Sequence, residues 1–223
     1  MPDALTSREA EPGAAIASVP LLPLFVKLEG RKVLVVGAGA MGTARVRQLA
    51  AAGARVRLVA PEITAEAAAL ADEVHCRPFA PTDLEGVWLA VAAASAAVNG
   101  EVARAAEARH VFVNAVDDPE RASAYTGGVV RRGGVVVAIS TEGRAPALAG
   151  LLREAVDAFL PADLGQWVDR AESLRAGWKR ERVPFAERRP RLLQVLLERY
   201  SLPAPDPIGP PSQSDPLDRT NIR

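Results

Sequence analysis

The first half of the sequence alternates short apolar runs with helix-like stretches, and this alternation restricts the chain to few folds. Strands are predicted at residues 32–37, 55–60, 73–77, 87–92 and 111–114, and helices at 41–52, 62–71 and 96–108. Strands separated by helices of about ten residues form parallel βαβ units. We therefore expect an α/β fold with a Rossmann-type parallel sheet and helices on both faces.

The pattern changes in the second half of the chain. Two strand-like runs, 125–132 and 134–140, are separated by a short turn that contains glycine. From Pro146 onward the spacing of apolar residues is helical, with helices expected over 146–160, 163–180 and 185–200. A small two-strand region and a helical region are therefore predicted to follow the sheet.

A glycine motif joins the first predicted strand to the first predicted helix. Residues 37–42 match G-x-G-x-x-G in the strand-to-helix context that this motif requires. The first glycine, Gly37, permits a tight turn, the second, Gly39, lets the backbone approach a pyrophosphate, and the third, Gly42, lets helix and strand pack closely. The pyrophosphate then lies on free N–H groups at the positive end of the helix. The motif predicts a dinucleotide site.

An acid that binds the adenosine ribose usually follows such a motif by about 20 residues. Glu62 stands 20 residues after Gly42, just past the second strand. It is equally well explained as an exposed residue in the first turn of the next helix, where the helix dipole favours an acid. Arg55 and Arg57 are of the type that binds the 2′-phosphate of NADP, but alternation along an exposed strand face also explains them. We expect NAD, and these residues leave NADP open.

Composition excludes several classes of function. Lys+Arg and Asp+Glu number 27 each, so the net charge of zero gives no support for nucleic-acid binding. The single cysteine, Cys76, excludes a disulfide framework and a multi-cysteine zinc site, and two histidines leave little for a metal site. The longest nearly apolar run, 87–98, is shorter than the roughly 20 residues of a membrane span, and the N-terminus lacks signal-peptide features. We expect a cytoplasmic protein with no nucleic-acid partner, no membrane partner and no metal site.

A collinear series of short motifs runs through residues 20–200. It comprises Pro23-Leu24-Phe25, residues 28–37, Val59-Ala60-Pro61-Glu62, Arg77-Pro78-Phe79, Asp83-Leu84, Val98-Asn99, residues 113–119, residues 139–143, Leu152-Arg153-Glu154, Leu164-Gly165-Gln166 and Glu187-Arg188-Arg189. This series resembles the siroheme-synthase dehydrogenase family, whose members are precorrin-2 dehydrogenases and, in some cases, also sirohydrochlorin ferrochelatases.

The resemblance implies a division of the chain. The family has an N-terminal Rossmann domain, a small dimerisation region and a C-terminal helical domain, and it forms homodimers. The resulting expectation is an NAD-binding Rossmann domain over 20–120, a dimerisation region over 121–160 and a helical domain at the substrate cleft over 161–201. Composition predicts a disordered N-terminus over 1–19 and a disordered, proline-rich tail over 202–223.

The resemblance also implies a reaction. NAD+ takes a hydride from the tetrapyrrole precorrin-2, a proton is lost, and the product is sirohydrochlorin, a precursor of siroheme. Members with a second activity then insert Fe2+, which is a substrate of that step. The resemblance leaves open whether this chain carries out the chelatase step.

Asp117 matches the residue that the family uses as its catalytic acid/base. It follows the fifth predicted strand, and ligands of open α/β sheets bind beyond the carboxyl ends of the strands. A carboxylate in a partly desolvated cleft accepts protons near neutral pH, as loss of a proton from the substrate requires. Without the resemblance, Asp117-Asp118-Pro119 is more typical of a turn.

The cofactor contacts follow from the resemblance by position. Ala40 and Met41 match positions that contact NAD through the phosphate loop, beside Gly37, Gly39 and Gly42. Pro61 and Glu62 match a second contact region near the adenosine.

Candidate substrate contacts are open to two interpretations each. Asn114 either orients the loop before Asp117 or is a satisfied core amide. Ser140, Thr141 and Arg144 either hold tetrapyrrole carboxylates or belong to an ordinary helix cap.

The sequence departs from the family at three places. Ala93-Ala94-Ser95 stands where polar residues are usual, Gly127-Gly128 where Pro-Ala is usual, and Ala145 where serine is usual before a helix proline. These departures motivate a rival hypothesis, a nucleotide or tetrapyrrole sensor that does no chemistry. A third hypothesis is a small-molecule Rossmann oxidoreductase outside the family.

Overall fold

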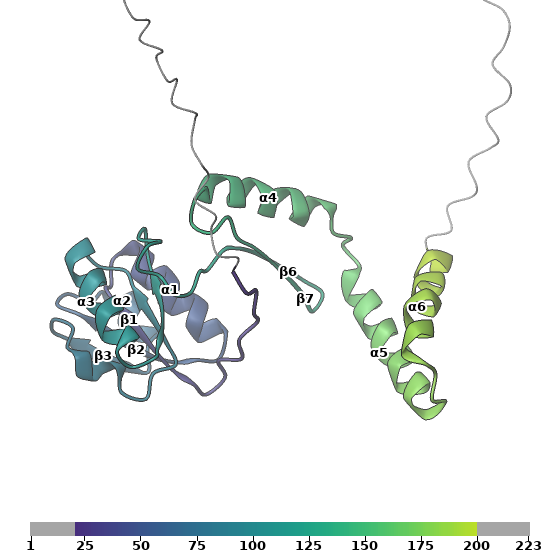
Figure 1. Ribbon diagram of the computed structural model, residues 1–223, viewed down its shortest axis with the longest axis horizontal. Helices are drawn as coiled ribbons and strands as arrows, with labels where there is room; N and C mark the ends of the chain where they lie inside the picture. The colour runs from purple at the N-terminus through teal and green to yellow at the C-terminus, as the bar shows by residue number, and fades with distance from the viewer. Residues whose placement is uncertain (1–20, 200–223) are drawn as a thin grey trace, which may run out of the picture. The chain divides into compact units, whose positions relative to one another are not determined.

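The computed structural model describes residues 21–199 (Figure 1). The ends predicted to be disordered, 1–19 and 202–223, lie outside the described residues. The chain divides into two compact units. The first runs to Gly128 and includes Ile139–Gly150, and the second includes Val129–Ala138 and the chain from Leu151 onward. The domain boundaries expected at residues 120 and 160 stay predictions.

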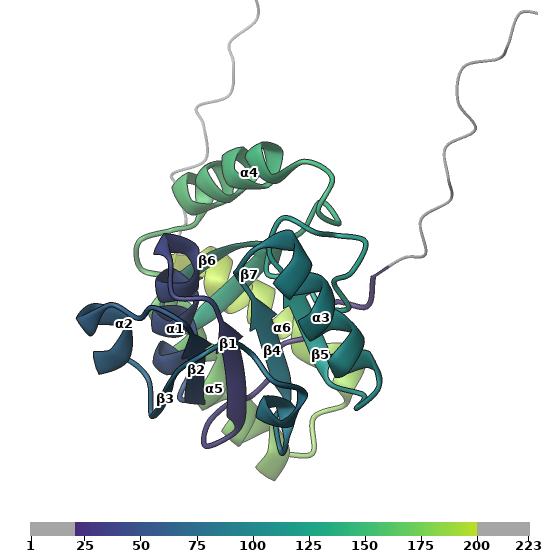
Figure 2. The same cartoon turned by 90° about the vertical axis from the view of Figure 1, so that its left-hand side faces the viewer.

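Five parallel strands form the centre of the first unit. They are β1 (Lys32–Val36), β2 (Arg55–Ala60), β3 (Glu73–Cys76), β4 (Leu89–Ala92) and β5 (Phe112–Ala115), in the order β3-β2-β1-β4-β5. Helices α1 (Ala40–Ala51) and α2 (Ala65–Ala69) lie on one side of the sheet and α3 (Ala96–Glu107) on the other (Figure 2). The predicted Rossmann-type fold is confirmed.

The central strand β1 is apolar from Val33 to Val36 because helices cover both faces of the sheet there. On one face Val33 and Val35 of β1 pack with Val46 of α1. On the other face Leu34 packs with Val102 of α3. Since successive strand residues point to opposite faces, alternate positions of β1 contribute to two separate cores. This explains why β1 reads as a continuous β-branched and leucine run.

A buried acid fastens the segment between β3 and β4 to the sheet. Asp83, in the turn η1 (Pro81–Leu84), has a side chain only 4% exposed and accepts hydrogen bonds from Arg77 and from the backbone N of Ala80. Burial is the largest single influence on this carboxyl and opposes its ionisation. The hydrogen bonds from Arg77 and Ala80, with the charge of Arg77, together outweigh burial and hold the pKa of Asp83 below its usual value.

Replacing Asp83 by asparagine should lower the free energy of unfolding by about 1–3 kcal/mol, because Arg77 loses its carboxylate partner. Since the folded-state pKa of Asp83 is lowered, this contribution is present above the unfolded value of about 4 and is lost as the pH falls through the folded value. Urea unfolding of wild type and Asp83→Asn should therefore differ at neutral pH and converge in acid. Glu85→Gln, at an exposed acid beside η1, should match wild type throughout. The prediction would be contradicted if the free energy of unfolding of Asp83→Asn were lower than that of wild type by the same amount at every pH.

A hairpin and three helices follow the sheet. Strands β6 (Gly128–Arg132) and β7 (Val135–Ile139) are joined by Gly133 and Gly134, whose φ values of +54° and +79° suit a two-residue hairpin turn. Helix α4 (Pro146–Phe159) comes next, and α5 (Leu164–Arg180) and α6 (Phe185–Arg199) pack against each other (Figure 1). No helix within residues 21–199 has the length and apolar character needed to cross a bilayer.

Three local predictions differ from the structure. The helix predicted over 62–71 is shorter, because the Thr64 hydroxyl accepts a hydrogen bond from Ala67 N and so begins α2 at Ala65. The strand predicted from residue 125 begins at Gly128, because residues 123–126 are bonded irregularly to β5. The sequence also does not predict η1, whose stabilising contacts come from Arg77 and Arg57 elsewhere in the fold.

Candidate functional site

The strand order reverses between β1 and β4, which is the point where folds of this kind bind ligands. Three loops meet at the carboxyl ends of β1, β4 and β5. Ala93 N donates to Val36 O at 2.8 Å, and Val116 N donates to Ala92 O at 2.9 Å. The loops after these three strands therefore form one continuous edge.

The glycine loop after β1 has the geometry that a dinucleotide requires. Gly37 has a φ of +103°, and a Cβ there would lie 2.3 Å from the carbonyl oxygen of Ala93, so only glycine fits. A Cβ on Gly42 would lie 2.0 Å from the carbonyl oxygen of Gly37, which is the close strand-to-helix packing that the motif predicts. A Cβ on Gly39 would meet nothing within 4 Å. The open space lies where a pyrophosphate would approach, and the residues present fit NAD(P).

Helix α1 begins with amides that a ligand can use. Gly39 is its N-cap residue and offers no side-chain hydrogen bond, and Thr43 N donates to Gly39 O at 2.9 Å. The amides that precede Thr43 at the helix start have no carbonyl partner within the helix. Ala40 and Met41 are exposed, while Gly42 is buried. The two residues predicted to contact the cofactor thus lie on the accessible side of the loop.

The second predicted cofactor segment follows β2. Pro61 and Glu62 are exposed and come directly after the last residue of β2, at the same carboxyl edge of the sheet as Gly37. Glu62 does not belong to the first turn of α2, since the N-cap residue of that helix is Thr64. The helix-dipole explanation of Glu62 is therefore wrong, whereas its role at the ribose stays a prediction.

Neither arginine of β2 is placed for a 2′-phosphate. Arg57 donates its Nε to Glu73 at 2.7 Å and a terminal nitrogen to Asp83 O at 2.9 Å. The hydrogen bond from Arg57 is also the main reason that the pKa of Glu73 is lowered. Arg55 is the first residue of β2 and so lies at the amino end of the strand, away from the glycine loop.

Asp117 stands on the loop after β5 in an uncommon backbone conformation. Its φ is +59°, in the left-handed region that few residues other than glycine adopt. Asp117 is exposed, and the backbone before it is fixed by the bond from Val116 N to Ala92 O. Asp118 instead forms an ion pair with Arg121, in keeping with a turn residue. Aspartate adopts this region more often than most residues, so the conformation suits a turn as well as an active-site loop, and the catalytic role of Asp117 stays a prediction.

A buried amide, missed by the sequence-based prediction, joins two of these loops. Asn99 of α3 is buried, accepts from Ala94 N at 3.0 Å and donates to Val116 O at 3.4 Å. It holds the loop after β4 against the residue that precedes Asp117. A polar residue on the apolar face of the predicted helix 96–108 is the sequence signal for such a role.

Asn114, in contrast, faces the interior of the first unit. Its Nδ2 donates to Ala124 O at 2.9 Å, and its Oδ1 accepts from Thr126 Oγ1 at 3.5 Å. Both ends of the buried amide are thus used within the chain. These contacts agree with a satisfied core amide, and contact with a substrate stays a prediction.

The loop over residues 140–145 packs against the loop that carries Asp117. Tyr125 donates its hydroxyl to Pro119 O at 2.8 Å. A Cβ on Gly143 would lie 2.9 Å from the Cβ of Pro119 and 3.4 Å from the Tyr125 ring. Both loops belong to the first unit. The predicted catalytic and substrate-binding segments are therefore neighbours.

The hydroxyls of the loop over residues 140–145 accept hydrogen bonds from the backbone of the same loop. Ser140 Oγ accepts from Glu142 N at 3.1 Å, and Thr141 Oγ1 accepts from Ala145 N at 3.2 Å, just before α4. These bonds lie within the loop and precede the first residue of α4, so the helix-cap role and the contact with a substrate both stay predictions. Arg144 extends outward, with a side chain 74% exposed that lies 3.5 Å from Glu142. Arg144 is thus the charged member of the predicted substrate set, and in the structure its exposed guanidinium pairs with Glu142.

Comparison with known proteins identifies the family. Residues 24–128 match a family described as putative NAD(P)-binding. Siroheme synthase 3 of Aeromonas hydrophila is 42% identical over 173 residues, which cover 75% of this chain and 37% of that protein. The siroheme synthase of Escherichia coli O157:H7 is 40% identical over 173 residues, which cover 75% of this chain and 38% of that protein. The chain belongs to the siroheme synthase family. The resemblance inferred from the sequence motifs is confirmed.

A solved structure extends this result to the fold. SirC, a precorrin-2 dehydrogenase, matches with a TM-score of 0.63 and 25% identity, over 81% of this chain and 92% of that chain. Within the siroheme synthase family, this chain spans little more than a third of the length of the curated relatives it matches. The matched range 24–128 contains both the glycine loop and Asp117.

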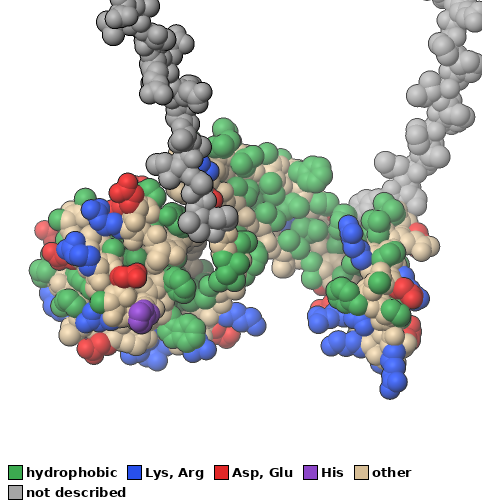
Figure 3. All heavy atoms as spheres, in the orientation of Figure 1, with side chains coloured by type: hydrophobic (Ala, Val, Ile, Leu, Met, Phe, Trp, Pro, Cys, Tyr) green, Lys and Arg blue, Asp and Glu red, His purple; other side chains and the backbone are tan. Residues whose placement is uncertain are grey.

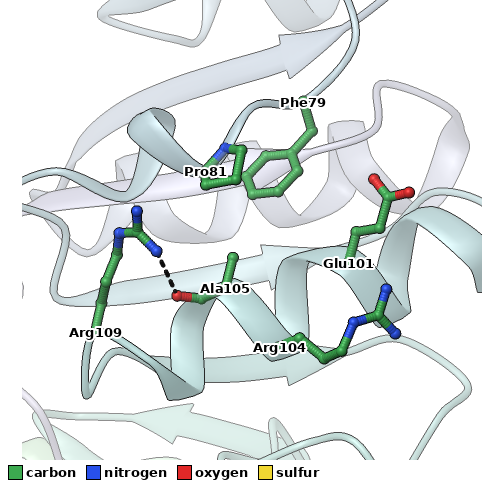
Figure 4. Close-up of a pocket in the computed structure, with 6 residues that line it drawn as sticks. All are labelled: Phe79, Pro81, Glu101, Arg104, Ala105 and Arg109. Atoms are coloured by element: carbon green, nitrogen blue, oxygen red, sulfur yellow. Dashed lines mark hydrogen bonds between the residues drawn. The ribbon is translucent and has the colours of Figure 1, made fainter.

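The first unit of this chain also has a pocket of about 370 Å³ away from the glycine loop (Figure 4). Its lining residues are Phe79, Pro81, Glu101, Arg104, Ala105 and Arg109. In the close-up, Arg109 donates to the carbonyl of Ala105 at 3.1 Å. None of the lining residues belongs to the glycine loop or to the segment 113–119, so this pocket is separate from the candidate site.

Proposed function

We propose that the chain is an NAD-dependent precorrin-2 dehydrogenase, which oxidises precorrin-2 to sirohydrochlorin in siroheme biosynthesis. The observation that carries the proposal is the adjacency of the glycine loop after β1 and Asp117 after β5, joined through residues 92–94 at one edge of the sheet. A cofactor on the glycine loop and an acid/base on Asp117 then serve one substrate. The siroheme synthase relatives and the likeness to SirC support this proposal.

The reaction has a simple balance: precorrin-2 and NAD+ give sirohydrochlorin, NADH and one proton. Bound NAD+ supplies the acceptor for the hydride. Asp117 is proposed to accept the remaining proton, because its exposed carboxylate stands at the ligand-binding edge of the sheet. The hydrogen bond from Val116 N to Ala92 O fixes the backbone from which this carboxylate extends.

The first amides of α1, near Ala40 and Met41, are proposed to bind the pyrophosphate, with Gly39 providing the room. Glu62, exposed beyond β2, is proposed to accept hydrogen bonds from the adenosine ribose hydroxyls. NAD is favoured over NADP because Glu62 would repel a 2′-phosphate and Arg57 is engaged by Glu73.

The substrate of this reaction carries several carboxylates. Arg144 is proposed to pair with one of them, while the hydroxyls of Ser140 and Thr141 shape the loop that presents it. The tetrapyrrole then lies over the two packed loops that carry Asp117 and Arg144.

A homodimer is proposed as the working form of the protein. Large apolar side chains gather along α4 in Figure 3, and those that are exposed include Leu148, Leu151, Leu152 and Phe159. A stripe of this kind on a helix is typical of a surface that packs against another chain. Mass measurement in solution at several protein concentrations tests the dimer directly.

Fe2+ enters the proposal only as a substrate of the second, chelatase step. No group of three or more His, Cys, Asp or Glu side chains in the described part of the chain is placed to hold a metal ion. The chelatase step and the cytoplasmic location stay predictions from the sequence.

Anaerobic mixing of the wild-type protein with NAD+ and freshly made precorrin-2 tests the proposed function. One NADH is expected for each sirohydrochlorin formed, and NADP+ should support a rate at least about tenfold lower, since unfavourable charge at the ribose end weakens its binding. Later addition of Fe2+ to the same cuvette reports on siroheme formation. A folded protein that binds NAD+ but forms no NADH would reject the dehydrogenase and favour the sensor.

A further inference from the structure

Arg45 of α1 has surroundings that the proposed roles do not explain. Its side chain is half-buried, and its Nε is buried without a hydrogen-bond acceptor among residues 21–199. Its Nη1 donates to Gln48 Oε1 at 2.8 Å, about one turn further along the helix, which fixes the direction of the guanidinium. A buried donor without an acceptor is uncommon and calls for an explanation.

The chain neighbours of Arg45 and Asp117 belong to one apolar cluster. The neighbouring residue Val46 is fully buried in the cluster that lies between α1 and the sheet. Val116, which immediately precedes Asp117, packs against that same cluster. Arg45, on the helix, and Asp117, on the loop after β5, therefore each follow or precede a residue that packs in this cluster.

The two side chains also interact by charge. Burial lowers the pKa of Arg45, whereas the carboxylate of Asp117 raises it. The other acid of the loop, Asp118, forms an ion pair with Arg121. Arg47, two residues along α1, is exposed and forms an ion pair with Glu66 of α2, so it does not share the environment of Arg45.

We propose that Arg45 is a positioning residue, whose guanidinium directs the Asp117 carboxylate toward the substrate. Gln48 holds the guanidinium, the guanidinium attracts the carboxylate, and the left-handed turn at Asp117 presents it at the strand ends. Arg45 does not touch the reacting atoms. The catalytic part of this inference rests on the proposed dehydrogenase function.

Steady-state kinetics of Arg45→Gln, Arg45→Lys and Arg47→Gln test the role. Arg45→Gln should lower kcat by about 10- to 100-fold and keep the KM values for NAD+ and precorrin-2 within about twofold, because a misdirected base affects the chemical step alone. Arg45→Lys keeps the charge and should recover most of the lost kcat, and Arg47→Gln should match wild type. Equal losses in both Arg45 variants, or a loss confined to KM, would overturn the proposal.

A thermal double-mutant cycle tests the pairing without any turnover. The Tm changes of Arg45→Gln and Asp117→Asn should not add in the double variant, since either single change already removes the interaction. In the matched cycle with Arg47→Gln, the changes should add. Additive changes in the Arg45 cycle overturn the proposal even if the enzyme is active. Coupled changes in a protein that does not oxidise precorrin-2 would instead uphold the pairing and reject the dehydrogenase function.

Discussion

Replacement of Asp117 by asparagine is expected to lower the rate of NADH formation from precorrin-2 by about 10²- to 10⁴-fold, the usual contribution of a general base. Asparagine keeps the size of aspartate and also tolerates the left-handed backbone at φ +59°, so the loop should remain folded. The carboxylate that accepts the proton is the part that is lost. The Kd for NAD+ should therefore stay at the wild-type value while kcat falls, and Tm should change only by the small amount that loss of the interaction with Arg45 costs.

Two further variants separate the carboxylate from its surroundings. Asp118→Asn removes an acid that already pairs with Arg121, and it should change kcat by less than about twofold, because an exposed ion pair contributes little. Asp117→Gly should be as inactive as Asp117→Asn but have an equal or higher Tm, since glycine adopts the left-handed conformation without strain. Wild-type turnover in either Asp117 variant would show that the base lies elsewhere.

Gly39→Asp is expected to abolish NAD+ binding in a protein that is folded at least as well as wild type. A Cβ at this position meets nothing within 4 Å, and aspartate is a better N-cap residue for α1 than glycine. Its charge also suits the positive end of the helix. That same charge would occupy the place of the pyrophosphate and repel it, so the Kd for NAD+ should rise by about 100-fold or more. Calorimetric titration with NAD+ and a thermal melt measure the two effects.

Gly37→Ala serves as the contrasting variant in the same loop. Its Cβ would lie 2.3 Å from the carbonyl oxygen of Ala93, at a φ of +103° that alanine rarely adopts. The loop must shift, so stability should fall by about 1–3 kcal/mol or more and NAD+ binding should weaken with it. An unchanged Kd for NAD+ in Gly39→Asp would show that the cofactor does not lie on this loop.

Most of the fold could be predicted from the sequence because local and tertiary preferences agree. β2 occupies the predicted residues 55–60, since a β-branched run bounded by Gly53 and Pro61 leaves the chain few alternatives. The weaker predictions lie where side chains decide the outcome. Thr64 ends the irregular segment before α2, and Asn114 with Ser123 keeps residues 123–126 out of the hairpin strand. Such contacts depend on partners that a local pattern does not contain.

The candidate site divides in the same way. The glycine loop is a local motif, so its geometry agrees with the prediction from the sequence. Gly37 and Gly42 leave no room for a Cβ, and Gly39 has open space around it. The role of Asn99 was not predicted, because this residue contacts the loop before Asp117 only after α3 has packed on the sheet. For Asp117 the motif resemblance indicated a role, but only the structure shows its left-handed backbone.

Parallel strands cannot form from adjacent stretches of chain, because each pair needs a crossover through a connecting segment. The central strand β1 pairs on one side with β4, so the sheet is complete only after most of the first unit has been assembled. The β6–β7 hairpin and the α5–α6 pair join segments that are neighbours in sequence, and such local contacts form faster than long-range ones. We therefore expect the β6–β7 hairpin and the α5–α6 pair to form before the parallel sheet is complete, although both follow the sheet in the sequence.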